Sequence, residues 1–281
     1  MIGVLLALVS AAGYGVSDFV GGIASRRVAA LRVVLVSYPV ALVLLTALSF
    51  VVGGQISSPA VLWGVLCGIS QAFGVWWFYA ALGAGPISVV SPLTAILVAG
   101  VPVGVGMALG ERPSALALLG IAVALGAVVL VSRGVSDEDP SPHRFTKTVA
   151  WLTVGSGLAF GLNFVLIDQA PVDAGLWPLV FARASATVLV VLIALAGGKL
   201  RVPTGVPLKL ALVAGVLDTV ANVAMLLALQ ASLLSLAGVL ISLYPASTVA
   251  LALLVLKEKV TRWQVVGMVA AAVAVAMIAL G

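Results

Sequence analysis

The chain has 281 residues, of which 63% are hydrophobic and only 8% are charged. A soluble domain carries about 25% charged residues and needs them to cover its surface, so the composition predicts an integral membrane protein. The formal net charge of +5 comes from short cationic clusters between apolar runs, a pattern typical of membrane loops and not of nucleic-acid binding. The remaining function classes are transport, channel activity, membrane enzymology and scaffolding.

Ten apolar runs along the chain have the length of a membrane-spanning helix, which needs about 20 residues. They lie at 2–24, 33–53, 60–83, 87–109, 113–132, 148–168, 175–197, 208–230, 234–256 and 261–280. Most connections between them are a few residues long, so consecutive helices are expected to be antiparallel neighbours. The sequence therefore predicts an all-α integral membrane protein with ten transmembrane helices.

One longer polar stretch, 133–147, divides the chain into halves of five predicted helices each, 1–132 and 148–281. It contains the only histidine, His143, which we interpret as a solvated loop residue. The only cysteine, Cys67, lies in an apolar run, so no intrachain disulfide is expected. Acids, bases and metal ligands are few and scattered, and we therefore predict no catalytic site, no metal site and no cofactor.

The distribution of Lys and Arg predicts the orientation, because loops that stay in the cytoplasm are enriched in these residues. The even-numbered connections contain only Arg112. The odd-numbered connections contain Arg26, Arg27, Arg32, Arg133, Arg144, Lys147, Lys199, Arg201, Lys209, Lys257, Lys259 and Arg262. We therefore expect the odd-numbered loops in the cytoplasm and both termini outside the cell.

The two halves repeat each other. A shift of 147 residues lays 68–134 on 215–281 without a gap, and a shift of 146 aligns the first helix of each half. Matched pairs are Ser88 and Ser235, Leu109 and Leu256, Glu111 and Glu258, and Gly120 and Gly267. Because five crossings is an odd number, the second half enters the membrane from the opposite side. Such inverted repeats are a known design of secondary transporters.

The segment AALGAGPISVVSPL at 80–93, followed by LGER at 109–112, resembles the EamA domain of the drug/metabolite transporter superfamily. The second half repeats it as LYP at 243–245 and LKEK at 256–259. The resemblance covers essentially the whole chain. It implies ten helices in two EamA repeats around a central cavity lined mainly by helices 1, 3, 4, 6, 8 and 9. Substrates in the family are amino acids, other metabolites, sugar derivatives and drugs.

The chain departs from the family in three respects. Arg183 has only Ser37 as its counterpart in the first half. Asp18 stands where the family more often has a neutral polar residue. Ten-helix relatives of known structure place both termini in the cytoplasm, whereas the Lys and Arg distribution here predicts the reverse. Inverted halves allow either orientation, and we follow the charges of this sequence.

Three ionisable residues fall inside the predicted spans: Asp18, Arg183 and Asp218. Asp18 is expected near the cytoplasmic end of its helix, where it either meets Arg26 or Arg27 or forms a proton or cation site. Arg183 and Asp218 are expected at the same depth, so they either form a packing ion pair or leave Asp218 in the cavity as a proton or ammonium site. An ionisable residue inside a membrane is costly, and each of the three is therefore a candidate for function.

Polar and aromatic residues in the spans complete the candidate site. Asn222 follows Asp218 by four residues and shares its helix face, and Gln71 is the repeat counterpart of Asp218. The further candidates for the cavity wall are Tyr14, Trp77, Asn163 and Tyr244. Each of the amide side chains could equally bond a neighbouring helix. We also expect Pro92, Pro102 and Pro245 to bend or break their helices in mid-membrane.

These features predict a multi-pass protein of the cell membrane that exports a small metabolite, amino acid or drug-like solute by alternating access. No phosphate-binding loop is present, so ATP is not the expected energy source, and Asp18 or Asp218 is the candidate for proton coupling. The partners are the solute and the lipid bilayer, and two fused halves allow a working monomer. The alternative is a membrane enzyme acting on a lipid or isoprenoid, which the absence of clustered catalytic groups disfavours.

Overall fold

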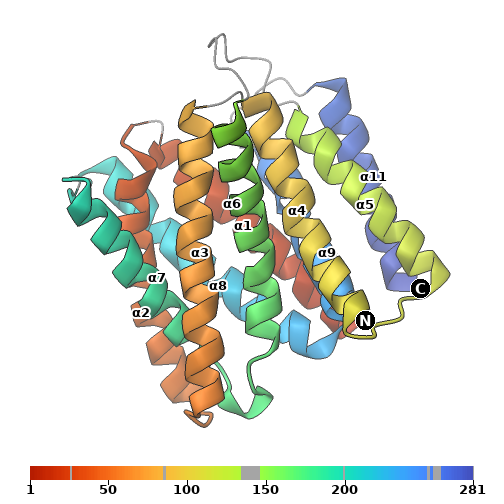
Figure 1. Ribbon diagram of the computed structural model, residues 1–281, viewed down its shortest axis with the longest axis horizontal. Helices are drawn as coiled ribbons and strands as arrows, with labels where there is room; N and C mark the ends of the chain where they lie inside the picture. Colours follow the sequence, from red (N-terminus) through yellow and green to blue (C-terminus); the bar gives the residue numbers. More distant parts are fainter. Residues whose placement is uncertain are drawn as a thin grey trace.

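The computed structural model describes residues 1–25, 27–84, 87–133, 146–198, 200–251, 254–255 and 261–280, which form helices and contain no strand (Figure 1). The helices are α1 (Ile2–Ser25), α2 (Ala30–Val52), α3 (Ser58–Ala84), α4 (Ile87–Ala108), α5 (Ala115–Arg133), α6 (Lys147–Asp168), α7 (Trp177–Ala196), α8 (Val206–Ala231), α9 (Leu234–Ile241), α10 (Tyr244–Leu251) and α11 (Arg262–Leu280), with a 3₁₀ helix, η2, at Val172–Ala174.

Polar side chains stabilise the points where several helices begin. Ser57, Ser114 and Thr146 each accept a hydrogen bond from the backbone N–H three residues later, at 3.0 to 3.4 Å. Thr261 and Gln264 form a reciprocal capping box at the start of α11. These caps satisfy backbone donors that the first turn leaves without an intrahelical partner, which matters most where a helix enters lipid.

The helices follow the predicted apolar runs closely, and the main departure is the run 234–256. It begins as α9, turns at Ser242 and Leu243, and starts again as α10. Pro245 is the second residue of α10; its ring lacks an N–H and would clash with a continuous helix, whereas the first turn of a new helix tolerates it. Pro92 and Pro102 do not break α4, which is continuous.

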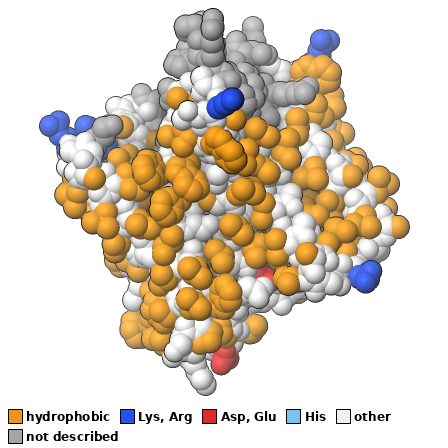
Figure 2. All heavy atoms as spheres, in the orientation of Figure 1, with side chains coloured by type: hydrophobic (Ala, Val, Ile, Leu, Met, Phe, Trp, Pro, Cys, Tyr) orange, Lys and Arg blue, Asp and Glu red, His pale blue; other side chains and the backbone are white. Residues whose placement is uncertain are grey.

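The outer surface is apolar. Within the described residues, seven helices are long and apolar enough to cross a bilayer, namely α1, α2, α3, α6, α7, α8 and α11. Figure 2 shows hydrophobic side chains covering the visible face and the Lys and Arg side chains lying at its edges. Both termini lie toward the same edge of the bundle in Figure 1. The molecule is therefore built to contact lipid around its circumference and water at its two ends.

The main contacts between the two halves occur twice, the second time with the roles of the two halves interchanged; we call this the exchanged packing. Helix α1 packs on α8 and on α10, and correspondingly α6 packs on α3 and on α4. Helix α3 packs on α7, and α8 packs on α2. The pairs α2 with α7, α4 with α9, and α5 with α11 join counterparts from the two halves. Exchanging the halves therefore reproduces these main helix pairs.

Individual residues at equivalent positions of the two halves also make equivalent contacts. A Cβ at Gly15 would meet the carbonyl of Tyr244 at 2.8 Å and the backbone of Thr248 at 3.1 Å. A Cβ at Gly161 would meet the carbonyl of Leu97 at 3.0 Å and the side chain of Val101 at 2.5 Å. These pairs are offset by 146 and 147 residues, the shifts at which the sequence repeats. Only glycine allows the two helix contacts, so the repeat is a repeat of packing as well as of sequence.

Candidate functional site

Two of the three ionisable residues predicted in the membrane form an ion pair. Arg183 of α7 and Asp218 of α8 lie 2.6 Å apart, Nη2 to Oδ2. The guanidinium carbon of Arg183 lies 4.5 Å from the centre of the Tyr38 ring on α2, a cation–π contact. Arg183 is 2% exposed and Asp218 is 17% exposed. The pair therefore joins three helices and neutralises both charges.

The surroundings of this pair come from close helix approach. Gly68 of α3 lies directly against the carbonyl of Ala182, where a Cβ would clash with backbone, and this contact seats α7 on α3. Asn222 donates its Nδ2 to the backbone carbonyl of Asp218 at 2.7 Å, so its amide side chain is used within α8. Among the described residues, Arg183 Nη1 has no hydrogen-bond partner.

Tyr38, which lies under Arg183, is a site residue that sequence analysis missed. The sequence comparison of the halves paired Arg183 with Ser37. In the structure, Gly68 meets Ala182 whereas its counterpart Gly215 meets the carbonyl of Ser37. This contact corresponds to an offset of 145 residues in the second helix of each half, so the structural counterpart of Arg183 is Tyr38. A one-residue slip in the repeat would have been the only indication in the sequence.

Asp18 has a different environment. The lipid-facing side of α1 is marked by Val9, which is 50% exposed. Asp18 follows it by nine residues, which is two and a half turns of helix, so it lies on the opposite, inner side of α1. Its side chain is nevertheless exposed. The described helices therefore leave Asp18 uncovered, although it lies on the inner side of α1.

Tyr14 and Tyr244 lie beside Asp18. Tyr14 precedes Asp18 by four residues on the same face of α1, and its ring meets that of Tyr244 edge to face, with centroids 6.4 Å apart and planes at 65°. The Tyr14 hydroxyl donates to Met225 Sδ of α8 at 3.4 Å. Asp18 shares a helix face with Tyr14, and Tyr14 contacts Tyr244, so the three side chains lie in one region between α1 and α10. We call Asp18, Tyr14 and Tyr244 the Asp18 cluster.

The break between α9 and α10 positions this cluster. Tyr244 is the first residue of α10, immediately after the turn. Thr248 Oγ1 donates to the carbonyl of Gly15 at 3.1 Å and to that of Tyr244 at 3.3 Å, tying α10 to α1. Because Gly15 has no side chain, the two backbones approach closely enough for the two tyrosine rings to touch.

Asn163 lies on α6, the counterpart of α1 in the second half, and joins α6 to α3. Its Nδ2 donates to the carbonyl of Cys67 at 3.2 Å and to Cys67 Sγ at 3.0 Å. Its repeat counterpart Ser17 donates to the carbonyl of Ala214 at 3.0 Å, and Ala214 is the counterpart of Cys67. Both residues thus make the same interhelical contact, and a role in solute binding for Asn163 stays a prediction.

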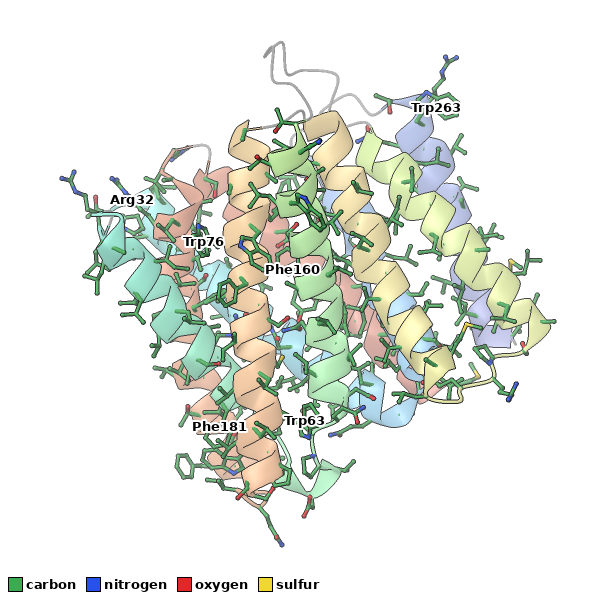
Figure 3. All side chains as sticks on the ribbon, in the orientation of Figure 1. Arg32, Trp63, Trp76, Phe160, Phe181 and Trp263 are labelled. Atoms are coloured by element: carbon green, nitrogen blue, oxygen red, sulfur yellow. The ribbon has the colours of Figure 1, made fainter. Side chains whose placement is uncertain are left out.

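Gln71 and Trp77 lie along α3. Gln71 follows Cys67 by one turn, is partly buried, and has no hydrogen bond to any described residue. Trp77 packs on Phe73 with ring centroids 5.3 Å apart and covers Gly155 of α6. Figure 3 shows Phe160 on α6 near the centre of the view, where its ring covers Gly74 of α3. No ring contact or hydrogen bond between described residues joins Trp77 to the Asp18 cluster.

Glu111 is a second residue whose role was not predicted. Its Oε1 and Oε2 accept hydrogen bonds from the backbone N–H groups of Leu234 and Ser235, at 2.5 and 3.0 Å. These are the first two residues of α9, so a carboxylate from the first half caps a helix of the second half. Glu258, the repeat counterpart of Glu111, lies outside the described residues.

Two tryptophans lie at opposite edges of the bundle. Figure 3 shows Trp263 at the upper edge of the bundle, at the same end as Arg32, and Trp63 at the lower edge. Trp76, by contrast, lines an apolar groove between α3 and α7. Within the described residues, no three His, Cys, Asp or Glu side chains are grouped closely enough to hold a metal ion.

Comparisons with known proteins agree with this architecture. The model of the EamA-like transporter family matches residues 1–133 and 147–280, which are the two halves of the chain. One solved crystal structure superposes with a TM-score of 0.79 at 15% sequence identity, over 99% of this chain and 96% of that chain. At that identity the likeness shows the fold alone. No curated protein matches the sequence.

Proposed function

Because the chain belongs to the EamA-like transporter family, we propose that it is a secondary transporter that moves a small organic solute across the cell membrane by alternating access. It is a helical multi-pass membrane protein with two EamA repeats. In the proposed form it has ten crossings, arranged as two inverted repeats of five helices. The two fused halves form a complete unit, so a monomer is sufficient.

The observation that carries the proposal is that equivalent helices of the two halves make equivalent contacts, including hydrogen bonds from polar side chains that face the inside of the bundle. Equivalent contacts occur at Gly15 and Gly161 and at Ser17 and Asn163. Each of two similar halves can adopt the conformation of the other. One arrangement then opens a central site to one side of the membrane, and the interchanged arrangement opens it to the other side. A channel has no need of such a pair of states.

The orientation follows from the distribution of charge. With the odd-numbered loops in the cytoplasm and both termini outside, the edge that carries Arg32 and Trp263 in Figure 3 is the cytoplasmic one. Asp18 then lies in the cytoplasmic half of α1. A solute bound there from the cytoplasm and released outside corresponds to export.

Proton coupling would use Asp18 in preference to Asp218. Asp218 is held by Arg183 at 2.6 Å, and removing its charge would leave the guanidinium unpaired inside the membrane. Asp18 is exposed and forms no ion pair with a described residue. It can therefore gain and lose a proton without breaking an ion pair between described residues.

The test begins with purified protein in detergent, screened for thermal stabilisation by amino acids, nucleosides, sugars and cationic drugs. Each stabilising solute is then loaded inside proteoliposomes, and uptake of the labelled solute from outside is measured without ATP. Secondary transport predicts saturable counterflow that protein-free liposomes lack. Uptake that requires ATP, or that rises linearly with concentration as in a pore, would contradict the proposal.

A further inference from the structure

The charge balance inside the bundle restricts what kind of solute can bind. Arg183 and Asp218 neutralise each other, and Arg183 is only 2% exposed. An anionic solute would have to displace Asp218 to reach the guanidinium. Asp18 is therefore the one of the three intramembrane charges that is exposed and that no described side chain balances.

Among the described residues, no Lys or Arg side chain forms an ion pair with Asp18, and Arg26, one of its predicted partners, lies outside them. Of the helices that pack on α1, α8 carries Asp218, which is already paired, α9 carries no ionisable residue, and α10 carries Tyr244, whose ring meets that of Tyr14. Arg32 on α2 and Lys209 on α8 form no ion pair with Asp18. A carboxylate inside a membrane is costly unless it is protonated or has a counter-ion. The Asp18 carboxylate is thus set up to gain stabilisation from a positive charge that comes from outside the protein.

The two tyrosines beside Asp18 favour an organic cation over a metal ion as its partner. The faces of aromatic rings attract cations, and aromatic side chains are the usual walls of sites for ammonium groups. Tyr14 and Tyr244 lie edge to face, so the pair presents ring surface in two different planes. The Tyr14 hydroxyl is used by Met225 Sδ. A small metal ion needs several oxygen ligands, and among the described residues no cluster of three acidic or metal-binding side chains exists.

Resting on the proposed transport function, we propose that the solute is an organic cation. Its ammonium group pairs with the carboxylate of Asp18, and its apolar body lies against the rings of Tyr14 and Tyr244. Arg183 and Asp218 serve as a neutral structural pair beside this site and do not bind the solute.

The test uses three solutes of similar size that differ in charge: phenethylammonium, 2-phenylethanol and 3-phenylpropionate. Binding to the purified protein is measured by isothermal titration calorimetry, and counterflow is measured in proteoliposomes for each solute. We expect phenethylammonium to bind at least tenfold more tightly than the other two and to be the one that shows saturable counterflow.

Matched variants test whether the carboxylate of Asp18 is the group that binds the ammonium. Asp18→Asn should weaken binding of phenethylammonium by about ten- to a hundredfold, the range for losing a charged hydrogen-bond partner. Asp18→Glu should retain part of the affinity. Asp173→Asn removes an exposed carboxylate on η2 and should change nothing. Size-exclusion profiles identical to the parent ensure that each variant is folded.

The aromatic wall is tested separately. Tyr244→Leu should weaken binding of phenethylammonium by about five- to thirtyfold, whereas Tyr244→Phe keeps the ring and should cost less than twofold.

The outcomes separate the two proposals. Saturable counterflow of 2-phenylethanol or 3-phenylpropionate in preference to phenethylammonium overturns the cationic solute and leaves secondary transport standing. Unchanged affinity in Asp18→Asn overturns the role of Asp18. Absence of counterflow for solutes of every charge, in protein that is folded, overturns both the transport function and this inference.

Discussion

Two aspartates inside the same bundle have opposite surroundings. Asp218 lies 2.6 Å from Arg183, is tied to a third helix through Tyr38, and is largely buried. Asp18 lies on the inner side of α1, is exposed, and has two tyrosine rings beside it. The comparison shows that a charge in a membrane span is not by itself a binding site. Whether the protein balances the charge decides whether it stabilises the fold or attracts a ligand.

The largest effect should come from breaking the ion pair. Arg183→Met leaves the Asp218 carboxylate buried without a counter-charge and should lower the free energy of unfolding by about 3–5 kcal/mol. Thermal unfolding of the purified protein measures this loss. The double variant Arg183→Met/Asp218→Leu removes both charges and should recover most of the stability. A double variant no more stable than Arg183→Met would show that the pair does more than balance charge.

The corresponding change at the other aspartate should leave the fold intact. Asp18→Asn removes a charge that nothing in the described protein balances, so the unfolding temperature should stay the same or rise. Binding of phenethylammonium should weaken by about 1.5–3 kcal/mol, the range for a hydrogen bond to a charged group. The same samples give both numbers, by thermal unfolding and by calorimetry. Strong destabilisation by Asp18→Asn would mean that the two aspartates have the same structural role.

A third prediction compares the contact of α1 with α10 and the equivalent contact of α6 with α4. Gly15→Ala places a Cβ against the carbonyl of Tyr244 and should push α10 away from α1, at a cost of about 1–3 kcal/mol in stability. Gly161→Ala makes the equivalent clash at Leu97, on the other side, and should cost a similar amount. The expected difference is in binding, because only Gly15→Ala moves Tyr244. Equal losses of phenethylammonium affinity in both variants would contradict the placement of the site.

The smallest effect is expected at Glu111, a carboxylate that the protein uses at a helix end. Glu111→Gln keeps the shape of the side chain but removes the charge that caps α9. It should lower the free energy of unfolding by about 0.5–2 kcal/mol, with binding of phenethylammonium unchanged. Asp173→Asn is the control for losing an exposed acidic charge. A loss of binding in Glu111→Gln without a loss of stability would place Glu111 in the solute path.

Much of the fold could be predicted from the sequence, because apolar runs bounded by polar residues determine where membrane helices begin and end. The depths of Arg183 and Asp218 likewise allowed the pair to be anticipated, since both follow from the rise of a helix. The family and its two repeats were predicted from short motifs around 80–93 and 109–112, and the match to the EamA-like transporter family confirms them.

The contacts between distant segments could not be predicted. The break just before Pro245 was predicted, but the sequence gives no sign that α4 stays continuous through Pro92 and Pro102, because packing and not proline alone decides whether a helix breaks. The partner of Glu111 lies 123 residues away along the chain. Sequence spacing shows that Tyr14 and Asp18 share a helix face, but only the close approach at Gly15 brings Tyr244 to them.

The central claim is that a site at Asp18 opens alternately to the two sides of the membrane, and cysteine labelling tests it most directly. The single native cysteine is buried, so Asp18→Cys in a Cys67→Ala background gives one reactive position. Membrane-impermeant thiol reagents are applied to either face of vesicles with known orientation. The account predicts that Cys at position 18 reacts with reagent from both faces. Reaction from one face only, however long the exposure, would contradict alternating access to this site.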